Sequence, residues 1–208
     1  MKKTLVILGG DTASEILTVA QQYYADQFDR IQKHYIDDDS EKALSLLKAT
    51  SDKVFYCMGI VDSKVTTEAI LVAKKLGMIP FTIIHPSAYI ADSATIGDGS
   101  FIAPQAVISI HAEIGDHSIV HFHCSIGHHA KLGNEVKILP GARISGGVTI
   151  EDGVLIGSNA FVLQNVKIGS RSKIDALTYV RQDLECDTLV SGRLSTPVRL
   201  PTNSDGQT

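Results

Sequence analysis

Large aliphatic residues recur at every sixth position over the second half of the chain. The series begins at Ile84 and continues without a break to Val180. A second series of small or aliphatic residues follows four positions after each member, from Ala88 to Leu184. A period of six matches neither an amphipathic α-helix, with a period of 3.6, nor a half-buried β-strand, with a period of two. The pattern therefore indicates a chain that turns at regular intervals.

This period predicts a triangular solenoid in which each repeat is one short strand followed by a corner. Three repeats complete one coil. The large residue fills the interior and the small residue lies where the wall bends. Coils of parallel strands stack about 4.8 Å apart, so the solenoid is roughly 25 Å long. Pairing within the stack leaves only its two ends open, and we expect an all-β, parallel β-helix.

Residues 1–82 follow a different pattern, in which short apolar runs alternate with stretches of helical periodicity. Strands are predicted at 4–8, 34–36 and 53–58, and helices at 13–25, 41–47 and 65–76. This alternation predicts a small parallel, Rossmann-like α/β sheet. We therefore expect an α/β domain over 1–82, the β-helix over 83–190, and a C-terminal tail over 191–208 whose polar end, 202–208, frays.

Composition narrows the class of partner. The 208 residues are 44% hydrophobic and 20% charged, which is typical of a folded globular protein. The net charge is −4 without a basic block, so nucleic acid is not an expected partner. Three widely spaced cysteines without a CxxC motif indicate neither a disulfide framework nor a structural zinc site. Neither a signal peptide nor an apolar run long enough to span a membrane is found, so we expect a cytoplasmic protein.

Two features of the α/β region suggest a nucleotide site. Gly9 and Gly10, followed by Asp11, form a turn between a strand and the N-terminus of a helix, where backbone N–H groups and the helix dipole favour a phosphate. The full G-x-G-x-x-G pattern is absent, so a tight turn without a ligand is an equal alternative. Asp37 and Asp38 end the second strand, where a parallel sheet presents acceptors to a ribose or a base. A solvated acidic loop is the alternative there.

Histidines cluster in one part of the solenoid. All of the cluster lies outside the two buried columns, so we expect these rings on corners and outer faces, as candidates for proton transfer or metal binding. The residues are His111, His117, His121, His123, His128 and His129.

Three repeats per coil identify neighbours in space. His128 lies one coil below Gly146, whose missing side chain exposes a backbone N–H, so the two residues can form a base and an oxyanion donor. His129 lies above His111, and each ring then disfavours protonation of the other. Two exposed rings without a role are the alternative for that second pair.

Three stretches resemble the NeuD/PglD group of hexapeptide-repeat sugar acyltransferases. They are 84–88 (IHPSA), 126–128 (IGH) and 138–150 (ILPGARISGGVTI), and the resemblance covers about residues 4–192. It implies a left-handed β-helix, a nucleotide-sugar-binding N-terminal domain, and a homotrimer that binds acetyl-CoA between adjacent prisms. The implied activity is acyl transfer from acetyl-CoA, as co-substrate, to an amino group of a nucleotide-linked amino sugar in surface-polysaccharide synthesis.

The resemblance also assigns roles to individual residues. His128 takes the position of the general base and Gly146 that of the oxyanion donor. Substrate contacts are implied for Gly9, Gly10, Asp11, Asp37, Asp38, His121, His129 and Lys137. Acetyl-CoA contacts are implied for Gly146, Gly147, Ala160 and Lys167.

The chain departs from this group around the base. The departures are His129 for the acidic residue after the base, His121 for an Asn seven residues before it, Lys137 for a His nine residues after it, and Ala13 for a His in the glycine-rich turn. Without an adjacent carboxylate, His128 should be a weaker base unless Asp116 or Glu113 of another chain supplies one. The Gly-x-Pro-Ala-Lys motif that this group carries near its C-terminus is also altered, over 191–197. CoA contacts are therefore less expected there.

Three other functions remain open. The scaffold also suits a sugar O-acetyltransferase of the sialic acid type, and the departures suit a nucleotide-sugar-binding scaffold that has lost turnover. A γ-carbonic-anhydrase-like metal hydratase needs three histidines shared between subunits. His123 and His128 have the required spacing, but Ser87 occupies the third position. We expect no metal and favour the acyltransferase.

Overall fold

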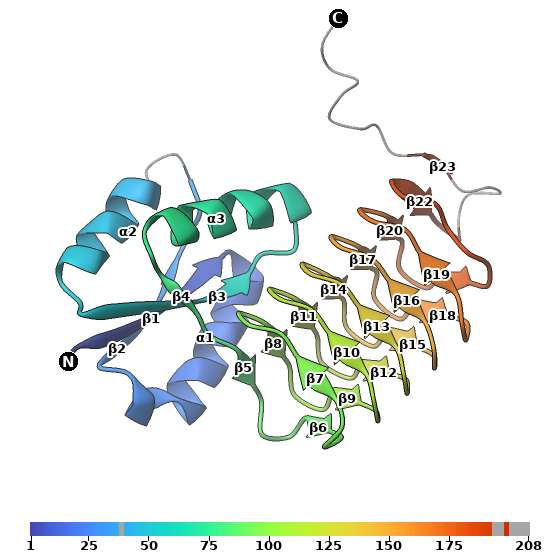
Figure 1. Cartoon of the computed structure of the whole chain (residues 1–208), viewed down its shortest axis with the longest axis horizontal. Coiled ribbons are helices and arrows are strands. Elements are labelled where there is room, and N and C mark those ends of the chain that lie inside the picture. The colour runs from blue at the N-terminus through green and yellow to red at the C-terminus, as the bar shows by residue number, and fades with distance from the viewer. Residues whose placement is uncertain (38–39, 193–197, 200–208) are drawn as a thin grey trace, which may run out of the picture.

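The structure is a computed structural model that describes residues 1–37, 40–192 and 198–199. Asp38, most of the altered C-terminal motif and the predicted frayed end, 202–208, lie outside these residues. The chain begins with a small α/β part and continues as a β-helix whose coils follow one another toward the C-terminus (Figure 1). Within the described residues, no helix combines the length and the apolar character that crossing a membrane requires.

The α/β part is a four-stranded parallel sheet with helices on both faces (Figure 1). The strands, in spatial order, are β2 (Arg30–His34), β1 (Lys3–Gly9), β3 (Lys53–Gly59) and β4 (Ile79–Pro80). The helices are α1 (Asp11–Tyr23), α2 (Ser40–Ala49) and α3 (Ser63–Lys75), with a short 3₁₀ helix, η1 (Ala25–Gln27), after α1. Alternate residues of β1 belong to two apolar clusters. Leu5 and Ile7 pack with α1, whereas Val6 and Leu8 pack with α2 and α3.

The second strand is the element whose position the sequence pattern misplaces. It was predicted at 34–36, but β2 covers Arg30–His34. This strand lies at the edge of the sheet, so its residues are only partly buried and carry little apolar signal. The apolar pair Tyr35-Ile36 follows the strand, and Tyr35 is exposed. Edge strands are poorly marked by hydrophobicity for this reason.

The β-helix consists mainly of two-residue strands in three parallel sheets, called here faces I, II and III. Face I contains β5 (Ile83–Ile84), β8 (Phe101–Ile102), β11 (Ile119–Val120), β14 (Lys137–Ile138), β17 (Leu155–Ile156), β20 (Lys173–Ile174) and β22 (Thr188–Val190), to which β23 (Val198–Arg199) adds in antiparallel orientation. Face II contains β6 (Tyr89–Ile90), β9 (Val107–Ile108), β12 (Ser125–Ile126), β15 (Arg143–Ile144), β18 (Phe161–Val162) and β21 (Tyr179–Val180). Face III contains β7 (Thr95–Ile96), β10 (Glu113–Ile114), β13 (Lys131–Leu132), β16 (Thr149–Ile150) and β19 (Lys167–Ile168).

Strand pairing confirms a coil of three repeats. Ile114 pairs with Leu132, and Leu132 pairs with Ile150. The two predicted columns of aliphatic and small residues together form one continuous apolar core. Residues between the columns are left for the corners and the outer faces, so the solenoid presents a regular surface on which functional side chains can be placed.

The α/β part packs against face I at the first coils. The outward side chains of Ile83, Phe101 and Ile119 are buried in the same apolar cluster as β1 and α1. Tyr24 fixes this junction, because its hydroxyl donates to the Ile84 carbonyl (2.9 Å) and accepts from the Ile84 N–H (3.0 Å). Corner residues near this junction are therefore covered by the α/β part.

Candidate functional site

His128 and Gly146 lie together at the corner that joins face II to face III. His128 follows β12, and Gly146 follows β15 one coil further on. A Cβ atom placed on Gly146 would meet Cε1 and Nε2 of the His128 ring at 2.5 Å. The absence of a side chain at Gly146 therefore lets the imidazole lie against the backbone of the next coil. The predicted neighbours are confirmed, and His128 is exposed.

The corner between faces III and I shows how the backbone is satisfied elsewhere. We count the large aliphatic residue as the first position of each repeat. At that corner, the N–H of the third residue donates to the side chain of the third residue one coil on: Asp98 to Asp116 Oδ1 (2.8 Å), Asp116 to Asn134 Oδ1 (2.9 Å) and Asn134 to Asp152 Oδ1 (2.7 Å). Gly146 has no side chain that could accept from His128. Within the described residues, neither the N–H of His128 nor that of Gly146 donates a hydrogen bond, which leaves both for a ligand oxygen.

Two further imidazoles adjoin His128. Its Nδ1 lies 3.2 Å from Nδ1 of His129. The His129 ring in turn packs on His111 one coil earlier, with ring centroids 4.9 Å apart and an angle of 44° between the planes. The predicted contact between His129 and His111 is confirmed, and all three rings are exposed. Three imidazoles thus follow one another along this corner.

Backbone geometry explains why so many histidines lie at corners. His111, His117, His123 and His129 occupy the fourth position of their repeats with φ between 54° and 59°. This left-handed region favours glycine and is tolerated by Asn, Asp and His. Gly99, Gly141, Gly147 and Gly153 occupy the same position with φ from 69° to 73°. The recurrence of glycine there is a sequence signal from which left-handed corners could have been inferred.

His117 and His121 are buried, contrary to the expectation that every ring of the cluster lies on an outer surface. They are only 7% and 5% exposed, because the α/β part covers their corners. His117 stacks on Tyr56 of β3 at 5.6 Å, and His121 Nε2 lies 3.4 Å from Glu15 of α1. Burial lowers the pKa of both imidazoles. These two histidines hold the junction together, and His121 offers little surface to a substrate.

Lys137 is likewise enclosed at the junction. Its side chain is 1% exposed, and its ammonium donates to the carbonyl of His117 (2.6 Å). Burial lowers the pKa of Lys137 to about 8, against the opposing effect of Glu135. A substrate contact was expected from this lysine. The structure instead buries its ammonium, which is hydrogen-bonded within the fold.

The glycine turn lies where it was predicted, and close packing against β3 explains why it needs glycine. Gly9 has φ of 137° and lies against the carbonyl of Gly59 in β3, where a Cβ would not fit. Gly10 is the N-cap of α1 without a side-chain hydrogen bond, and Asp11 begins the helix. The turn therefore brings the N-terminus of α1 to the carboxyl end of the parallel strands, where ligands bind in open α/β sheets.

Lys33 and Tyr35 are neighbours of this turn that the sequence reasoning missed. The Lys33 ammonium contacts the hydroxyl of Ser14 in α1 (2.6 Å) and lies 4.4 Å from the centre of the Tyr35 ring. Tyr35 Cε1 lies 3.7 Å from the position of a Cβ on Gly10. A cation and an exposed aromatic ring thus border the glycine turn. Lys33 belongs to the edge strand β2, whose position was predicted wrongly, and Tyr35 follows that strand directly.

Asp37 serves as a local cap in this structure. Its carboxylate accepts from the Ser40 hydroxyl (2.9 Å), and its backbone N–H donates to the same hydroxyl oxygen (2.7 Å). These bonds order the start of α2. Asp37 therefore lies just after β2, as predicted. Its carboxylate already has a structural role, so a ligand would have to bind beside these hydrogen bonds.

The residues expected to bind acetyl-CoA differ in what they offer. Gly147 donates its N–H to the His128 carbonyl (2.9 Å) and so ties the two coils together. Ala160 is fully buried, and its N–H and carbonyl are both used within the β-helix, so it offers no contact surface. Lys167 is exposed on face III and pairs with Glu151 (2.9 Å). This pairing and the hydrogen bonds from Ser170 lower the pKa of Glu151 to about 2.

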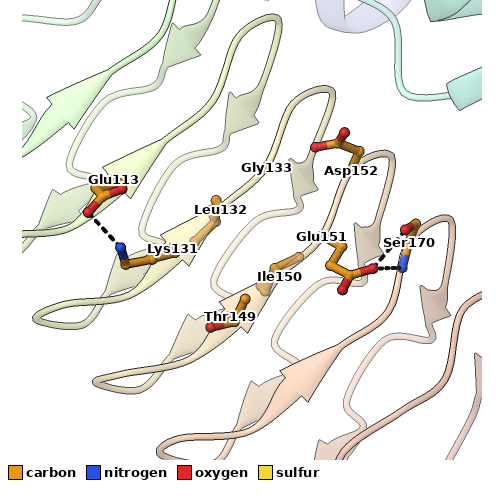
Figure 2. A pocket seen from close by; sticks show the side chains of 9 residues that line it. All are labelled: Glu113, Lys131, Leu132, Gly133, Thr149, Ile150, Glu151, Asp152 and Ser170. Atoms are coloured by element: carbon orange, nitrogen blue, oxygen red, sulfur yellow. Dashed lines mark hydrogen bonds and ion pairs between the residues drawn. The ribbon is translucent and has the colours of Figure 1, made fainter.

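A hollow of 360 Å³ lies on face III near its corner with face I (Figure 2). Its floor is formed by successive strands, and Lys131 reaches Glu113 across its edge (3.0 Å). The lining residues are Glu113, Lys131, Leu132, Gly133, Thr149, Ile150, Glu151, Asp152 and Ser170. Neither His128 nor Gly146 lines the hollow, and its carboxylates and Lys131 already have partners within the chain. We therefore place the candidate chemistry at His128 and not in this hollow.

The two carboxylates considered as partners of His128 are engaged elsewhere in this chain. Glu113 pairs with Lys131, and Asp116 accepts from the Asp98 backbone. Within the described residues, no three His, Cys, Asp or Glu side chains come together as a group that could hold a metal ion. The imidazole of His129 is the group that contacts Nδ1 of His128.

Comparisons with known proteins identify this architecture. No family model and no curated protein matches the sequence. Among solved structures, the chain matches the acetyltransferase domain of PglB from Neisseria gonorrhoeae FA1090, with a TM-score of 0.82 and 24% identity over 95% of this chain and 100% of that one. It matches WeeI from Acinetobacter baumannii AYE with a TM-score of 0.85 and 20% identity over the same shares. This chain shares their fold.

A further match is PerB from Caulobacter crescentus, solved in complex with CoA and GDP-perosamine. Its TM-score is 0.60 and its identity 21%, over 94% of this chain and 97% of that one. The agreement extends over nearly the whole length of each chain. The predicted β-helix, with its period of six, is thereby confirmed.

Proposed function

We propose that this protein transfers an acetyl group from acetyl-CoA to the amino group of a nucleotide-linked amino sugar. The observation that carries the proposal is the imidazole of His128 lying against Gly146, with the N–H of Gly146 free of any acceptor within the described residues. A base beside an unpaired backbone donor suits attack on a thioester carbonyl. Support comes from the neighbours of the fold, which include a perosamine N-acetyltransferase in complex with CoA and GDP-perosamine.

The chemistry follows from these two groups. The sugar amine attacks the thioester carbonyl, a C–N bond forms, and Nε2 of His128 accepts the proton that the nitrogen loses. The carbonyl oxygen becomes an oxyanion, which the N–H of Gly146 stabilises. Collapse of this intermediate breaks the C–S bond, and the imidazolium of His128 returns its proton to the sulfur of CoA. A base of this kind typically contributes a factor of about 10² to 10⁴ in rate.

We further propose a division of labour along the chain. Residues 1–82 would act as a Rossmann-like nucleotide-sugar-binding domain, with the diphosphate at Gly9, Gly10 and Asp11 and the ribose or base near Asp37 and Asp38. The nearby Lys33 ammonium and Tyr35 ring add a positive charge and a stacking surface. Residues 83–190 would form the left-handed acyltransferase domain, and 191–208 a tail.

Acetyl-CoA would extend from Gly146 and Gly147 toward Lys167, between the prisms of a cytoplasmic homotrimer. The exposure of His128 and His129 in the single chain supports this arrangement, since a second prism over the corner would exclude water from the reaction. The length of acyl chain that the enzyme accepts would then be a property of that interface.

A thiol-release assay tests this proposal. Acetyl-CoA would be offered with a panel of UDP-, GDP- and dTDP-linked 3-amino and 4-amino sugars, including GDP-perosamine. Release of CoA with one donor, lost in His128→Ala, supports the proposal. Tight binding of nucleotide sugar with no CoA release would indicate a scaffold without turnover, and release with a hydroxyl acceptor in place of the amine would indicate an O-acetyltransferase.

A further inference from the structure

We propose that His129 takes the place of a carboxylate and holds His128 in the tautomer that carries its proton on Nδ1. This inference rests on the proposed function only in so far as His128 is the base. The tautomer itself is a property of the free protein. His129 is thus assigned as a positioning residue that acts through His128.

The two nitrogens of His128 have different surroundings. Nδ1 faces Nδ1 of His129 at 3.2 Å, with the two ring planes at 82°. Nε2 is among the ring atoms that lie against Gly146. Two neutral imidazoles can share the Nδ1 contact only if one donates a proton and the other accepts it. The contact therefore fixes the tautomer of both rings together.

The direction of this hydrogen bond follows from what the reaction needs and from the surroundings of His129. If His128 donates from Nδ1, its Nε2 keeps a lone pair at the Gly146 edge, where the acceptor amine must arrive. If His129 donated instead, the lone pair of His128 would be used in the contact and Nε2 would carry a hydrogen. The His111 ring packs against His129, with ring centroids 4.9 Å apart, and so holds the accepting ring in place.

A neutral acceptor differs from a carboxylate in one respect. It orients the base but supplies no negative charge to the imidazolium that forms during the reaction. Other charged groups near this corner are Glu113 and Lys131 on face III, which pair with each other (3.0 Å), and Arg143 on face II beside Ser125. His129 thus acts on His128 through orientation alone.

The backbone conformation at His129 accepts several residue types, so His129 can be replaced without disturbing the corner. Its φ of 58° is shared by other residues at the fourth position of a repeat, among them Asn159, Glu135 and Leu177. His129→Asn keeps an acceptor in nearly the same place, His129→Glu restores a carboxylate, and His129→Leu removes the acceptor. His123→Leu is the matched control, because His123 occupies the same repeat position with φ of 59°.

The first test reads the tautomer directly. Long-range ¹H–¹⁵N spectra of the full chain with ¹⁵N-labelled histidine, recorded without substrate, should show the His128 proton on Nδ1. His129→Leu should move it to Nε2, while His129→Asn and His123→Leu leave it on Nδ1. A His128 proton on Nε2 in the wild-type protein, or a spectrum of His128 unchanged in His129→Leu, would overturn the proposal.

The second test uses the acyl-transfer reaction. His129→Leu should lower kcat at least about tenfold with little change in KM, because the base is then in the wrong tautomer. His129→Asn and His129→Glu should each restore most of kcat, because each again offers an acceptor to Nδ1 of His128. Equal kcat in His129→Leu and wild type would refute the role. Full activity of His128→Ala would instead refute the proposed function, while the spectra would still report on the tautomer.

Discussion

A missing methyl group shapes the corner that holds His128. The ring occupies the space that a Cβ on Gly146 would take. Because the ring is the mobile end of a side chain, a methyl group there would displace the imidazole and leave the coil intact. At the scale of the residue, Gly146 therefore matters more to the position of the base than to the stability of the fold.

Gly146→Ala tests this separation of roles. We expect a loss of acetyl transfer of about tenfold or more, since the base is moved from its place, with a change in the free energy of unfolding of about 1 kcal/mol or less. Kinetics and chemical denaturation of the same preparation measure both. Gly192→Ala is the matched control, because a Cβ there makes only ordinary contacts. Unaltered turnover in Gly146→Ala would contradict the assigned geometry.

Lys137 gives a pH dependence whose sign follows from its lowered pKa. The folded protein holds this proton with a pKa of about 8, whereas the ordinary value is 10.5. Between these values the unfolded chain binds more protons, so stability rises with pH through this window. The increase between pH 7 and pH 9 should be about 1 kcal/mol.

Urea denaturation of wild type and Lys137→Met at pH 7 and pH 9 measures this contribution. The thiols of Cys57 and Cys124 act in the opposite sense above about pH 9, because burial raises the pKa of each to about 12. The difference between the two proteins removes that contribution. The same pH dependence in both proteins would show that Lys137 is not the source.

At the scale of the element, the β-helix was predictable because its register leaves no freedom. Each large aliphatic residue must point inward in every coil, so the period of six and the coil of three repeats follow from the sequence alone. The left-handed corners were predictable in the same way, from Gly99 and Gly141 at the fourth position. The position of the edge strand β2 was not predictable from hydrophobicity, because Arg30–His34 is only partly buried and mostly polar.

The contact between β3 and α1 supports a prediction about stability. A Cβ on Gly59 would lie 2.5 Å from Cα of Ala13 and 2.6 Å from its Cβ. Because Gly59 belongs to β3 and Ala13 to α1, moving the two residues apart would disturb a regular element. Gly59→Ala should therefore lower the free energy of unfolding by about 3 kcal/mol, measured by denaturation with Gly192→Ala as control. A change below about 0.5 kcal/mol would show that the helix can shift away.

At the scale of the whole molecule, the junction decides which histidines are available. Counting positions placed all six rings outside the core, but the sequence does not state which corners the α/β part covers. A signal existed in the outward residues of face I, where Phe101 and Ile119 are apolar. His117 and His121 lie beside them and are buried, whereas His128 and His129, which face away from the junction, are exposed.

The proposed trimer makes a prediction about an exposed apolar surface. Phe161 and Tyr179 pack edge to face on the outside of face II with ring centroids 5.4 Å apart, and both are exposed in the single chain. Phe161→Glu should convert trimers to single chains in light scattering and reduce acetyl transfer with them. Leu71→Glu, at an exposed position of α3, should do neither. A trimer unaffected by Phe161→Glu would place the interface elsewhere.

The central claim is that an acetyl group passes from CoA to a sugar nitrogen at His128. The most direct measurement is NMR of the product formed from ¹³C-acetyl-CoA and the amino-sugar nucleotide that releases CoA. The account predicts an amide carbonyl signal that correlates with the proton on the sugar nitrogen, with its rate of appearance reduced at least about a hundredfold in His128→Ala. An ester signal, or an amide that forms equally fast in His128→Ala, would contradict it.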